Sequence, residues 1–181
     1  MAHHSELRGG IFGPESIDVA LCSLADAQRL VKCFHRHHGK VAGHKFSLKA
    51  RMLNVIRTIE AGVAIVGRPV SRHLDDGQTL EITRLATSSQ PNVASKLLAS
   101  AAREAKRRGF LRIITYTLAS ESGTSLRAAG YEIDAQTKGG SWNVPSRARV
   151  DKHPTGPKTR WIRRLGAVQS QPGHHNFLRN E

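Results

Sequence analysis

The amino-acid sequence predicts a mixed α/β domain in which helices flank a central sheet. Three consecutive segments carry this prediction. Residues 79–87 alternate apolar or β-branched residues with other side chains, as a strand does, and residues 111–118 are again rich in β-branched residues. Between them, residues 92–108 place apolar side chains at helical spacing, and Gly109 stands where a helix commonly ends. A strand–helix–strand unit of this length joins two parallel strands through a right-handed crossover.

Shorter patterns on either side of this unit complete the sheet. Strands are predicted at residues 16–21, 46–53, 62–70, 132–137 and 158–165, the last of them closing the sheet, and helices at residues 25–37 and 124–129. Residues 54–60 are expected to form a bend or turn, and the Asp-Gly pair within residues 71–78 indicates a hairpin. The domain therefore spans residues 16–165, between polar tails at residues 1–15 and 166–181.

The charge of the chain is strongly positive. Its 181 residues contain 28 lysines and arginines against 14 aspartates and glutamates, a formal net charge of +14 at pH 7. A surface of this charge attracts polyanions, so DNA, RNA or a phosphorylated cofactor is an expected partner. Aromatic residues make up only 5% of the chain, which argues against a surface that binds single strands by stacking their bases.

Apolar segments and cysteines bear on the cellular compartment. The sequence has no run of about 18 apolar residues, so no membrane-spanning helix is expected, and the N-terminus lacks the apolar stretch of a signal peptide. Cys22 and Cys33 lie in apolar segments and are expected to be buried, reduced thiols. These features predict a cytoplasmic protein and leave its oligomeric state open.

Residues 34–46, FHRHHGKVAGHKF, are rich in histidine and lysine. A metal site would draw on three imidazoles, those of His35, His38 and His44. Because no acidic residue and no His-Glu-x-x-His or Cys-x-x-Cys pattern frames them, no metal is expected. Two interpretations stay open: a solvated basic turn, or the wall of a site that touches an anionic substrate. The substrate-binding residues on the second interpretation are His37, His38, His44 and Lys45.

The order of these elements resembles the GNAT acyltransferase superfamily. Residues 90–95, Gln-Pro-Asn-Val-Ala-Ser, stand where that superfamily has Q/R-x-x-G-x-G/A, with Val93 in place of a glycine that lets phosphates approach the backbone. The resemblance implies a mixed sheet whose two central strands splay apart. It also implies acetyl-CoA or another acyl-CoA, with its pyrophosphate on the amides of the turn and the helix start. The residues that it assigns to this cofactor are Leu85, Ala86, Thr87, Gln90, Asn92, Val93, Ala94, Ser95 and Lys96.

A second resemblance covers about residues 17–165. The pieces HRHH, GHKFS, EITRLAT, N-x-x-S-K-L, ITYTL-x-SESG-x-SLRAAGY and KTRW are similar to a little-characterised GNAT-like family of phages and mobile elements. That family is similar in outline to Mom-type phage proteins, which modify adenine in DNA. The main prediction is an acyl-CoA-dependent transfer of an acyl group to an amine. Its alternatives are a Mom-like modification of DNA bases and a non-catalytic protein that binds nucleic acid.

Acyl transfer to an amine calls for a general base and often for an acid that protonates the leaving thiolate. By resemblance, Glu81 lies on the strand that carries the base. Arg84 is a candidate substrate contact, but it falls on the opposite face of a regular strand from Glu81 unless a bulge intervenes. The register of the usual tyrosine acid holds Leu126, so Tyr116 is the nearest phenol.

The sequence Ser-Glu-Ser-Gly at residues 120–123 follows the second central strand, where polar groups of α/β sites gather. Glu121 is an alternative base there, and Ser122 offers a hydroxyl. The segment fits a helix-capping turn equally well. Arg127, in the helix that follows, is a candidate contact for an anionic substrate.

Overall fold

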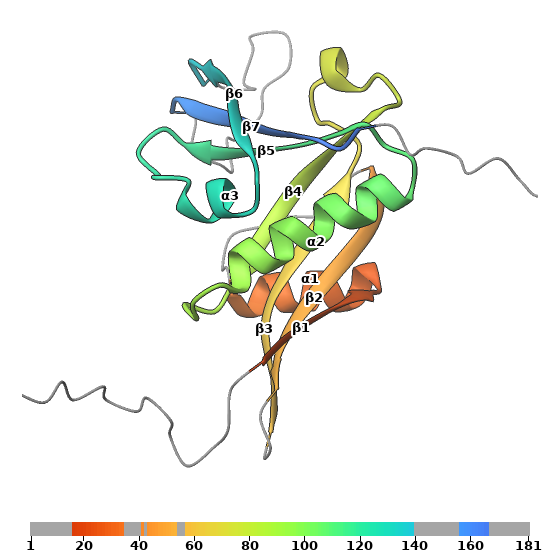
Figure 1. Ribbon diagram of the computed structural model, residues 1–181, viewed down its shortest axis with the longest axis vertical. Helices are drawn as coiled ribbons and strands as arrows, with labels where there is room; N and C mark the ends of the chain where they lie inside the picture. Colours follow the sequence, from red (N-terminus) through yellow and green to blue (C-terminus); the bar gives the residue numbers. More distant parts are fainter. Residues whose placement is uncertain (1–15, 35–40, 42, 54–56, 140–155, 167–181) are drawn as a thin grey trace, which may run out of the picture.

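The computed structural model describes residues 16–34, 41, 43–53, 57–139 and 156–166, which form one twisted sheet with helices on both faces (Figure 1). The strands are β1 (Ser16–Cys22), β2 (His44–Leu53), β3 (Thr58–Gly67), β4 (Thr79–Thr87), β5 (Arg112–Leu118), β6 (Glu132–Thr137) and β7 (Lys158–Arg164). The helices are α1 (Leu24–Phe34), α2 (Val93–Arg107) and α3 (Thr124–Ala128), with a 3₁₀ turn at Arg72–Leu74. The order in the sheet is β1-β2-β3-β4-β5-β7-β6.

The sheet is antiparallel except between its two central strands. β4 and β5 run parallel and pair only over Thr79–Glu81 and Arg112–Ile114. Beyond that point the two strands separate, which leaves the β5 side of the second half of β4 without a strand neighbour. The mixed α/β fold class, the parallel strand–helix–strand unit and the splayed centre are therefore confirmed.

Two details of the predicted sheet are wrong. β3 begins at Thr58, inside the predicted bend, because Thr58, Ile59 and Glu60 pair with the end of β2 and Glu60 also meets Lys49 at 3.5 Å. It ends at Gly67, so residues 68–70 lie outside the strand. The last strand, β7, does not close the sheet: it lies between β5 and β6, and β6 forms the edge.

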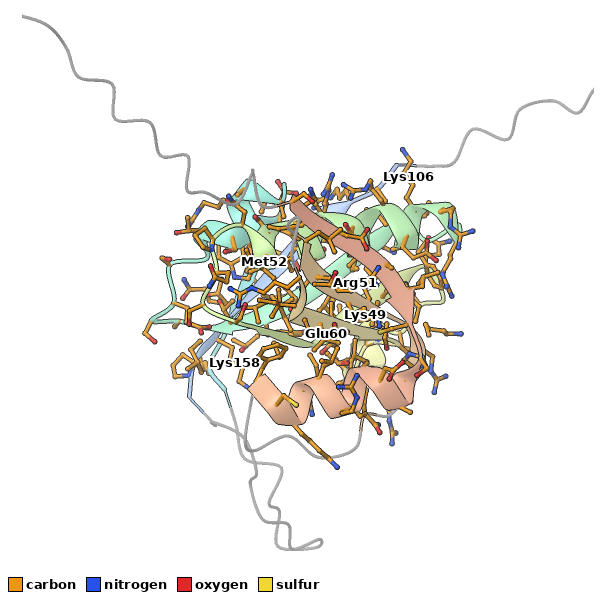
Figure 2. All side chains as sticks on the ribbon, turned by 90° about the horizontal axis from the view of Figure 1, so that it is seen from below. Lys49, Arg51, Met52, Glu60, Lys106 and Lys158 are labelled. Atoms are coloured by element: carbon orange, nitrogen blue, oxygen red, sulfur yellow. The ribbon has the colours of Figure 1, made fainter. Side chains whose placement is uncertain are left out.

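Helix α2 packs its apolar side on one face of the sheet, here called the α2 face. The buried side chains of this helix are Val93, Leu97, Leu98, Ala101, Ala102 and Ala105. Its alanines allow a close approach to Leu48, Ala64 and Leu80 of the sheet. Helix α1 covers the other face, the α1 face, through Ala27, Leu30 and Val31, which pack against Val63, Ile65 and Ala86. Lys49, Arg51 and Glu60 project from this α1 face (Figure 2).

Trp161 anchors the half of the core beneath β5 and α3. It is 2% exposed, and its Nε1 donates to Thr117 Oγ1 at 3.0 Å. Trp161 is therefore a core residue, whereas Trp142 lies outside the described residues. The expectation that both cysteines are buried is wrong: Cys33 is exposed on α1, and Cys22 is only partly buried. No helix in the described part of the chain is long and apolar enough to cross a membrane.

Candidate active site

A bulge in β4 places Glu81 and Arg84 on the same face of the sheet. Ile65 of β3 pairs with Arg84 and Val66 pairs with Ile82, so Thr83 is an extra residue between them. The Thr83 hydroxyl donates to Ile65 O at 3.2 Å. The bulge shifts the alternation of β4 by one residue, and Arg84 comes within electrostatic range of Glu81.

Glu81 is a buried carboxylate at the point where β4 and β5 separate. Glu81 is only 6% exposed. It is the last residue of β4 that pairs with β5, and its partner there is Ile114. Its Oε2 accepts a hydrogen bond from Val70 N at 2.9 Å. Burial raises the pKa of Glu81, and the Val70 hydrogen bond and the charges of Arg84 and Lys158 oppose that rise. A raised pKa suits a carboxylate that accepts a proton.

Tyr116 lies two residues beyond Ile114, the β5 partner of Glu81, and therefore points to the same face of the sheet as Ile114. Burial raises the pKa of Tyr116; a hydrogen bond from Arg160 opposes this rise, and the charge of Glu81 adds to it. Arg160 in turn donates from Nε to Asp134 Oδ2 at 2.5 Å. The structure thus links Tyr116, Arg160 and Asp134 across β5, β7 and β6.

Sequence reasoning missed Asp134 and Arg160 as site residues. Asp134 is an extra residue of β6 between Ile133, which pairs with Trp161, and Ala135, which pairs with Arg160, so regular alternation does not place it beside Arg160. Lys158, on the same strand as Arg160, lies on the side of the sheet that α1 covers (Figure 2).

Gly67 brings the start of β2 over the sheet beside Glu81. His44 pairs with Gly67, and Gly67 pairs with Glu81. A Cβ on Gly67 would lie 2.6 Å from Gly43 O, which accepts a hydrogen bond from Arg68 N at 2.8 Å. The missing side chain therefore lets Gly43 cross the α1 face next to Glu81.

His44 stands roughly 10 Å from Glu81 across the sheet, because one strand separates them. Its Nε2 shares a hydrogen bond with Ser47 Oγ at 2.9 Å. Burial, and then the charge of Arg108, lower the pKa of His44, which favours a neutral imidazole. Lys45 has an exposed side chain at a bulge of β2.

The other predicted histidines, His35, His37 and His38, lie outside the described residues. Within the described residues there is no group of three or more His, Cys, Asp or Glu side chains that could hold a metal ion.

The N-terminus of α2 is open. Asn92 precedes the helix with φ 63°, the only positive φ of a non-glycine residue in the part of the chain that the structure describes. Its side chain makes no capping hydrogen bond, and the first turn contains no acidic residue. The first amides of a helix lack intrahelical acceptors, so those of Val93, Ala94 and Ser95 are available to an anion. Lys96, exposed in the same turn, adds a positive charge.

Val93 does not crowd this helix end. Its side chain is fully buried and turns inward to β3, where a Cβ on Gly62 would lie 3.0 Å from Val93 Cγ1. The same Cβ would lie 2.9 Å from Thr87 Cγ2. The glycine that the sequence motif lacks at position 93 is thus matched by a glycine on the neighbouring strand, which accommodates the valine.

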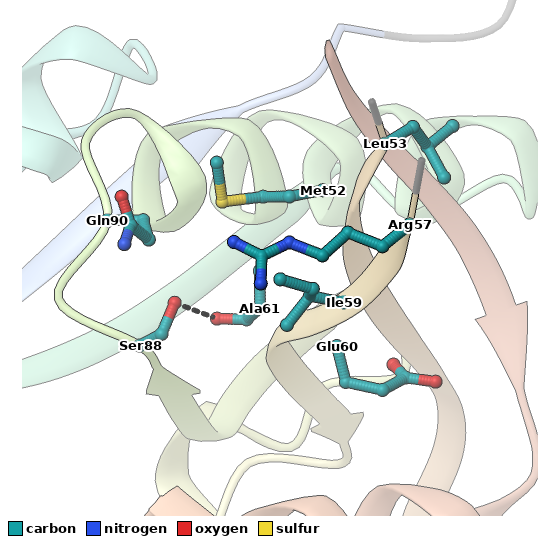
Figure 3. A pocket seen from close by; sticks show the side chains of 8 residues that line it. All are labelled: Met52, Leu53, Arg57, Ile59, Glu60, Ala61, Ser88 and Gln90. Atoms are coloured by element: carbon teal, nitrogen blue, oxygen red, sulfur yellow. Dashed lines mark hydrogen bonds between the residues drawn. The ribbon is translucent and has the colours of Figure 1, made fainter. Parts of the chain in front are cut away.

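A cavity of about 120 Å³ adjoins the turn between β4 and α2 (Figure 3). Its lining combines the end of the β2–β3 hairpin with the turn: Met52, Leu53, Arg57, Ile59, Glu60, Ala61, Ser88 and Gln90. Ser88 Oγ fixes the turn by donating to Ala61 O at 3.0 Å. Among the predicted cofactor residues on β4, Ala86 is buried under α1, so only its backbone faces the separated strands; Leu85 and Thr87 are partly exposed.

Three predicted residues lie apart from Glu81, in the turn between β5 and α3 and in α3 itself. Glu121 Oε2 accepts a hydrogen bond from Leu118 N at 2.8 Å, and Ser122 Oγ lies 2.9 Å from Thr124 Oγ1. Arg127 donates to Ser122 O and lies over the ring of Trp161, 5.0 Å from its centroid. These contacts hold the turn against the core of the α2 face.

Comparison with known proteins identifies the fold. No protein-family model and no curated protein matches the sequence. Among solved structures, a phosphinothricin acetyltransferase of the GNAT superfamily from Sinorhizobium meliloti, in complex with AcCoA, matches with a TM-score of 0.59 and 14% identity, over 90% of this chain and 96% of that chain.

Two further structures agree. An IAA acetyltransferase from Bacillus cereus matches with a TM-score of 0.58 and 15% identity, over 83% of this chain and 100% of that one. A Bacillus subtilis acetyltransferase in complex with CoA matches with a TM-score of 0.51 and 15% identity, over 84% and 99%. The chain therefore has the fold of the GNAT acetyltransferases.

Proposed function

We propose that this protein is an N-acyltransferase that moves an acyl group, such as acetyl, from coenzyme A to an amine. One observation carries the proposal: a buried carboxylate, Glu81, stands where β4 and β5 separate, and the uncapped N-terminus of α2 follows the same strand. A base and an anion site are thus placed at the two ends of an open strand edge. The GNAT-like fold supports this assignment.

The residues along β4 and α2 fit an acyl-CoA. The pyrophosphate would lie on the amides of Val93, Ala94 and Ser95, with Lys96 supplying a positive charge. The β5 side of residues 85–87 has no strand partner, so their backbone groups are available to the amides of the pantetheine arm. When bound, acyl-CoA supplies a thioester whose carbonyl carbon is open to attack by an amine.

Glu81 acts as the general base. Its raised pKa makes the carboxylate a better proton acceptor than an ordinary glutamate, and the Val70 amide fixes its orientation. The ammonium form of the acceptor would lose one proton to Glu81, which releases it to solvent. The amine nitrogen would then bond to the carbonyl carbon as the carbon–sulfur bond breaks, and the second proton would leave the nitrogen through Glu81 to give a neutral amide.

Tyr116 is the proton donor to the departing thiolate. Its phenol stays protonated near neutral pH because burial raises its pKa, and the Arg160 guanidinium stabilises the phenolate that forms as the proton leaves. Asp134 holds Arg160 in place. Glu121, the alternative base, stays a weaker candidate, since it is exposed and lies in the turn before α3, apart from the point where β4 and β5 separate.

Calorimetric titration with acetyl-CoA tests the cofactor site. We expect wild-type binding in the micromolar range, weakened about 3- to 10-fold by Lys96→Gln, because a charged contact to phosphate is lost. Lys106→Gln is the matched control, since Lys106 lies on the same helix but in its last turn (Figure 2). No binding by the wild type, or equal weakening by both variants, would contradict the proposal.

The net charge of +14 keeps a nucleic-acid acceptor as an alternative prediction. A Mom-like modification of DNA bases and simple nucleic-acid binding both predict affinity for DNA that falls steeply with salt. Mass analysis of nucleosides from cells that express the protein separates these two alternatives.

A further inference from the structure

The guanidinium of Arg84 lies on the α1 face with few partners. Its Nη1 donates to Thr83 O at 2.6 Å, within its own strand, whereas its Nε is buried and has no hydrogen-bond partner among the residues that the structure describes. Burial lowers the pKa of Arg84, and the charge of Glu81 opposes that shift. Arg84 is partly buried, and an anion could supply acceptors for the donors that its guanidinium leaves unused.

Other arginines of the sheet form ion pairs with carboxylates, although the buried Nε of Arg51, like that of Arg84, has no hydrogen-bond partner among the described residues. Arg51 contacts Asp18, Arg112 contacts Asp76 and Arg160 contacts Asp134. Within the described part of the chain, Arg84 makes no such ion pair, and the carboxylate whose charge acts on it is that of Glu81. The lack of a carboxylate ion pair therefore distinguishes Arg84 from these three arginines. Arg84 is also the arginine whose charge acts on Glu81, the proposed base.

The backbone of Arg84 also borders the opening between the central strands. β4 and β5 stop pairing at Glu81, so Arg84 has no strand neighbour on its β5 side. Because strands rise about 3.3 Å per residue, Arg84 and Glu81 lie roughly 7–10 Å apart along β4. One small molecule can reach both side chains if its amine and its anionic group are a few bonds apart.

The remaining charges around this opening leave Arg84 free for an anion. Asp134 is engaged by Arg160, and the charges of Lys158 and Arg84 both act on Glu81. Once Glu81 has taken up a proton, neither Glu81 nor Asp134 balances the positive charges of Arg84 and Lys158. An anionic group beside the amine would restore the balance.

We propose that Arg84 binds an anionic group of the acceptor, which is thus a small amine bearing a carboxylate or a phosphate a few bonds from its nitrogen. This inference rests on the proposed function, because it seats the amine of the same molecule at Glu81. It names a substrate class that the fold alone does not define.

The NMR signal of the Arg84 side-chain Nε–Hε group tests this site without turnover. Its absence from spectra of Arg84→Gln identifies the signal. Glycine and O-phosphoethanolamine are titrated beside their neutral-headed counterparts, glycinamide and ethanolamine. A selective shift with glycine assigns a carboxylate, one with O-phosphoethanolamine assigns a phosphate, and a shift with both supports the shared chemistry.

Two results of the titration would overturn the proposal. The first is that neither anionic compound shifts the signal more than its counterpart. The second is that a DNA oligonucleotide shifts the signal and neither small anion does, which would assign Arg84 to a nucleic-acid backbone. Both results stand whether or not the protein transfers acyl groups, so a failed transfer assay remains distinguishable from a failed anion site.

Steady-state kinetics of acyl transfer give a second test of the Arg84 site. For an anionic acceptor, Arg84→Gln should lower kcat/KM about 10- to 100-fold. For its neutral counterpart, kcat/KM should change less than about threefold. Arg51→Gln is the matched control, because Arg51 also projects from the α1 face but contacts Asp18. An equal loss for the anionic and neutral acceptors would overturn the proposal, since Arg84 would then support the fold or the base.

Discussion

The Val93 side chain packs against β3 at Gly62, where a Cβ would come within 3.0 Å of it. Gly62→Ala should therefore push Val93 outward toward the amides of the α2 N-terminus. We expect a loss of about 1–3 kcal/mol in unfolding free energy, as for other overpacked cores, together with weaker acetyl-CoA binding. Denaturant unfolding and calorimetry of the same sample measure both effects.

The double variant Gly62→Ala with Val93→Ala is the control for this prediction. It removes the valine methyls, so part of the stability and of the acetyl-CoA affinity should return. A double variant no better than Gly62→Ala would mean that the contacts with Thr87 and Leu97, and not Val93, carry the effect.

Glu81 should make the unfolding free energy depend on pH, and the burial of its carboxyl group determines the sign of that dependence. The pKa of Glu81 is raised in the folded protein above the ordinary value of 4.5, so the folded state favours the protonated form. The contribution of Glu81 to the unfolding free energy is therefore most favourable at pH values below its ordinary pKa. This contribution is lost as the pH rises through the pKa of Glu81 in the folded state. Wild-type protein should therefore lose unfolding free energy relative to Glu81→Gln as pH rises across this window.

Unfolding by denaturant at a series of pH values measures this difference. Gln is a suitable replacement because its side-chain oxygen can still accept the hydrogen bond from Val70 N. A difference between the two proteins that stays constant with pH, or that changes in favour of the wild type as pH rises, would show that the fold does not raise the pKa of Glu81.

Tyr116→Phe tests the proton donor. We expect kcat to fall about 10- to 100-fold, with acetyl-CoA affinity unchanged, because only protonation of the thiolate is affected. Arg160→Gln should lower kcat less but in the same direction, since Arg160 stabilises the phenolate. A rate unaffected by Tyr116→Phe would remove Tyr116 from the mechanism and leave solvent as the proton source.

Gly123 tests the packing of the turn before α3. It has φ +67°, and a Cβ there would lie 2.2 Å from Trp161 Cζ2. Gly123→Ala should cost more than about 2 kcal/mol of unfolding free energy, because a positive φ and an overlap with a buried ring add together. The control is Gly77→Ala, with φ +77° and no atom within 4 Å, where about 1 kcal/mol is expected. Equal costs at both positions would contradict the packing argument.

The sequence was informative where local pattern and tertiary structure agree. The boundaries of β4 and the apolar side of α2 follow directly from residue spacing, since both elements bury one side against the core. Glu81 as a candidate base came instead from the resemblance to the GNAT superfamily, and its role stays a prediction. In contrast, the place of β7 between β5 and β6 depends on pairing over long sequence separations, which alternation alone does not specify.

In the candidate site, too, local sequence patterns do not reveal the features that depend on tertiary structure. The bulge at Thr83 was open as a hypothesis, but nothing local distinguishes it from a regular strand, because its cause is the pairing of β3 with β4. Val93 looked incompatible with a phosphate site because its compensating residue, Gly62, lies about thirty positions earlier. Asp134 became a site residue only through Arg160 of the neighbouring strand.

The most direct measurement of the central claim is acyl transfer itself. Wild-type protein and Glu81→Gln are incubated with acetyl-CoA and a pool of amines, and acetylated products are followed by mass spectrometry. We predict amine acetylation by the wild type, a rate about 10²- to 10⁴-fold lower for Glu81→Gln, and the same acetyl-CoA affinity for both. Bound acetyl-CoA without transfer to any amine, or equal rates for the two proteins, would contradict the account.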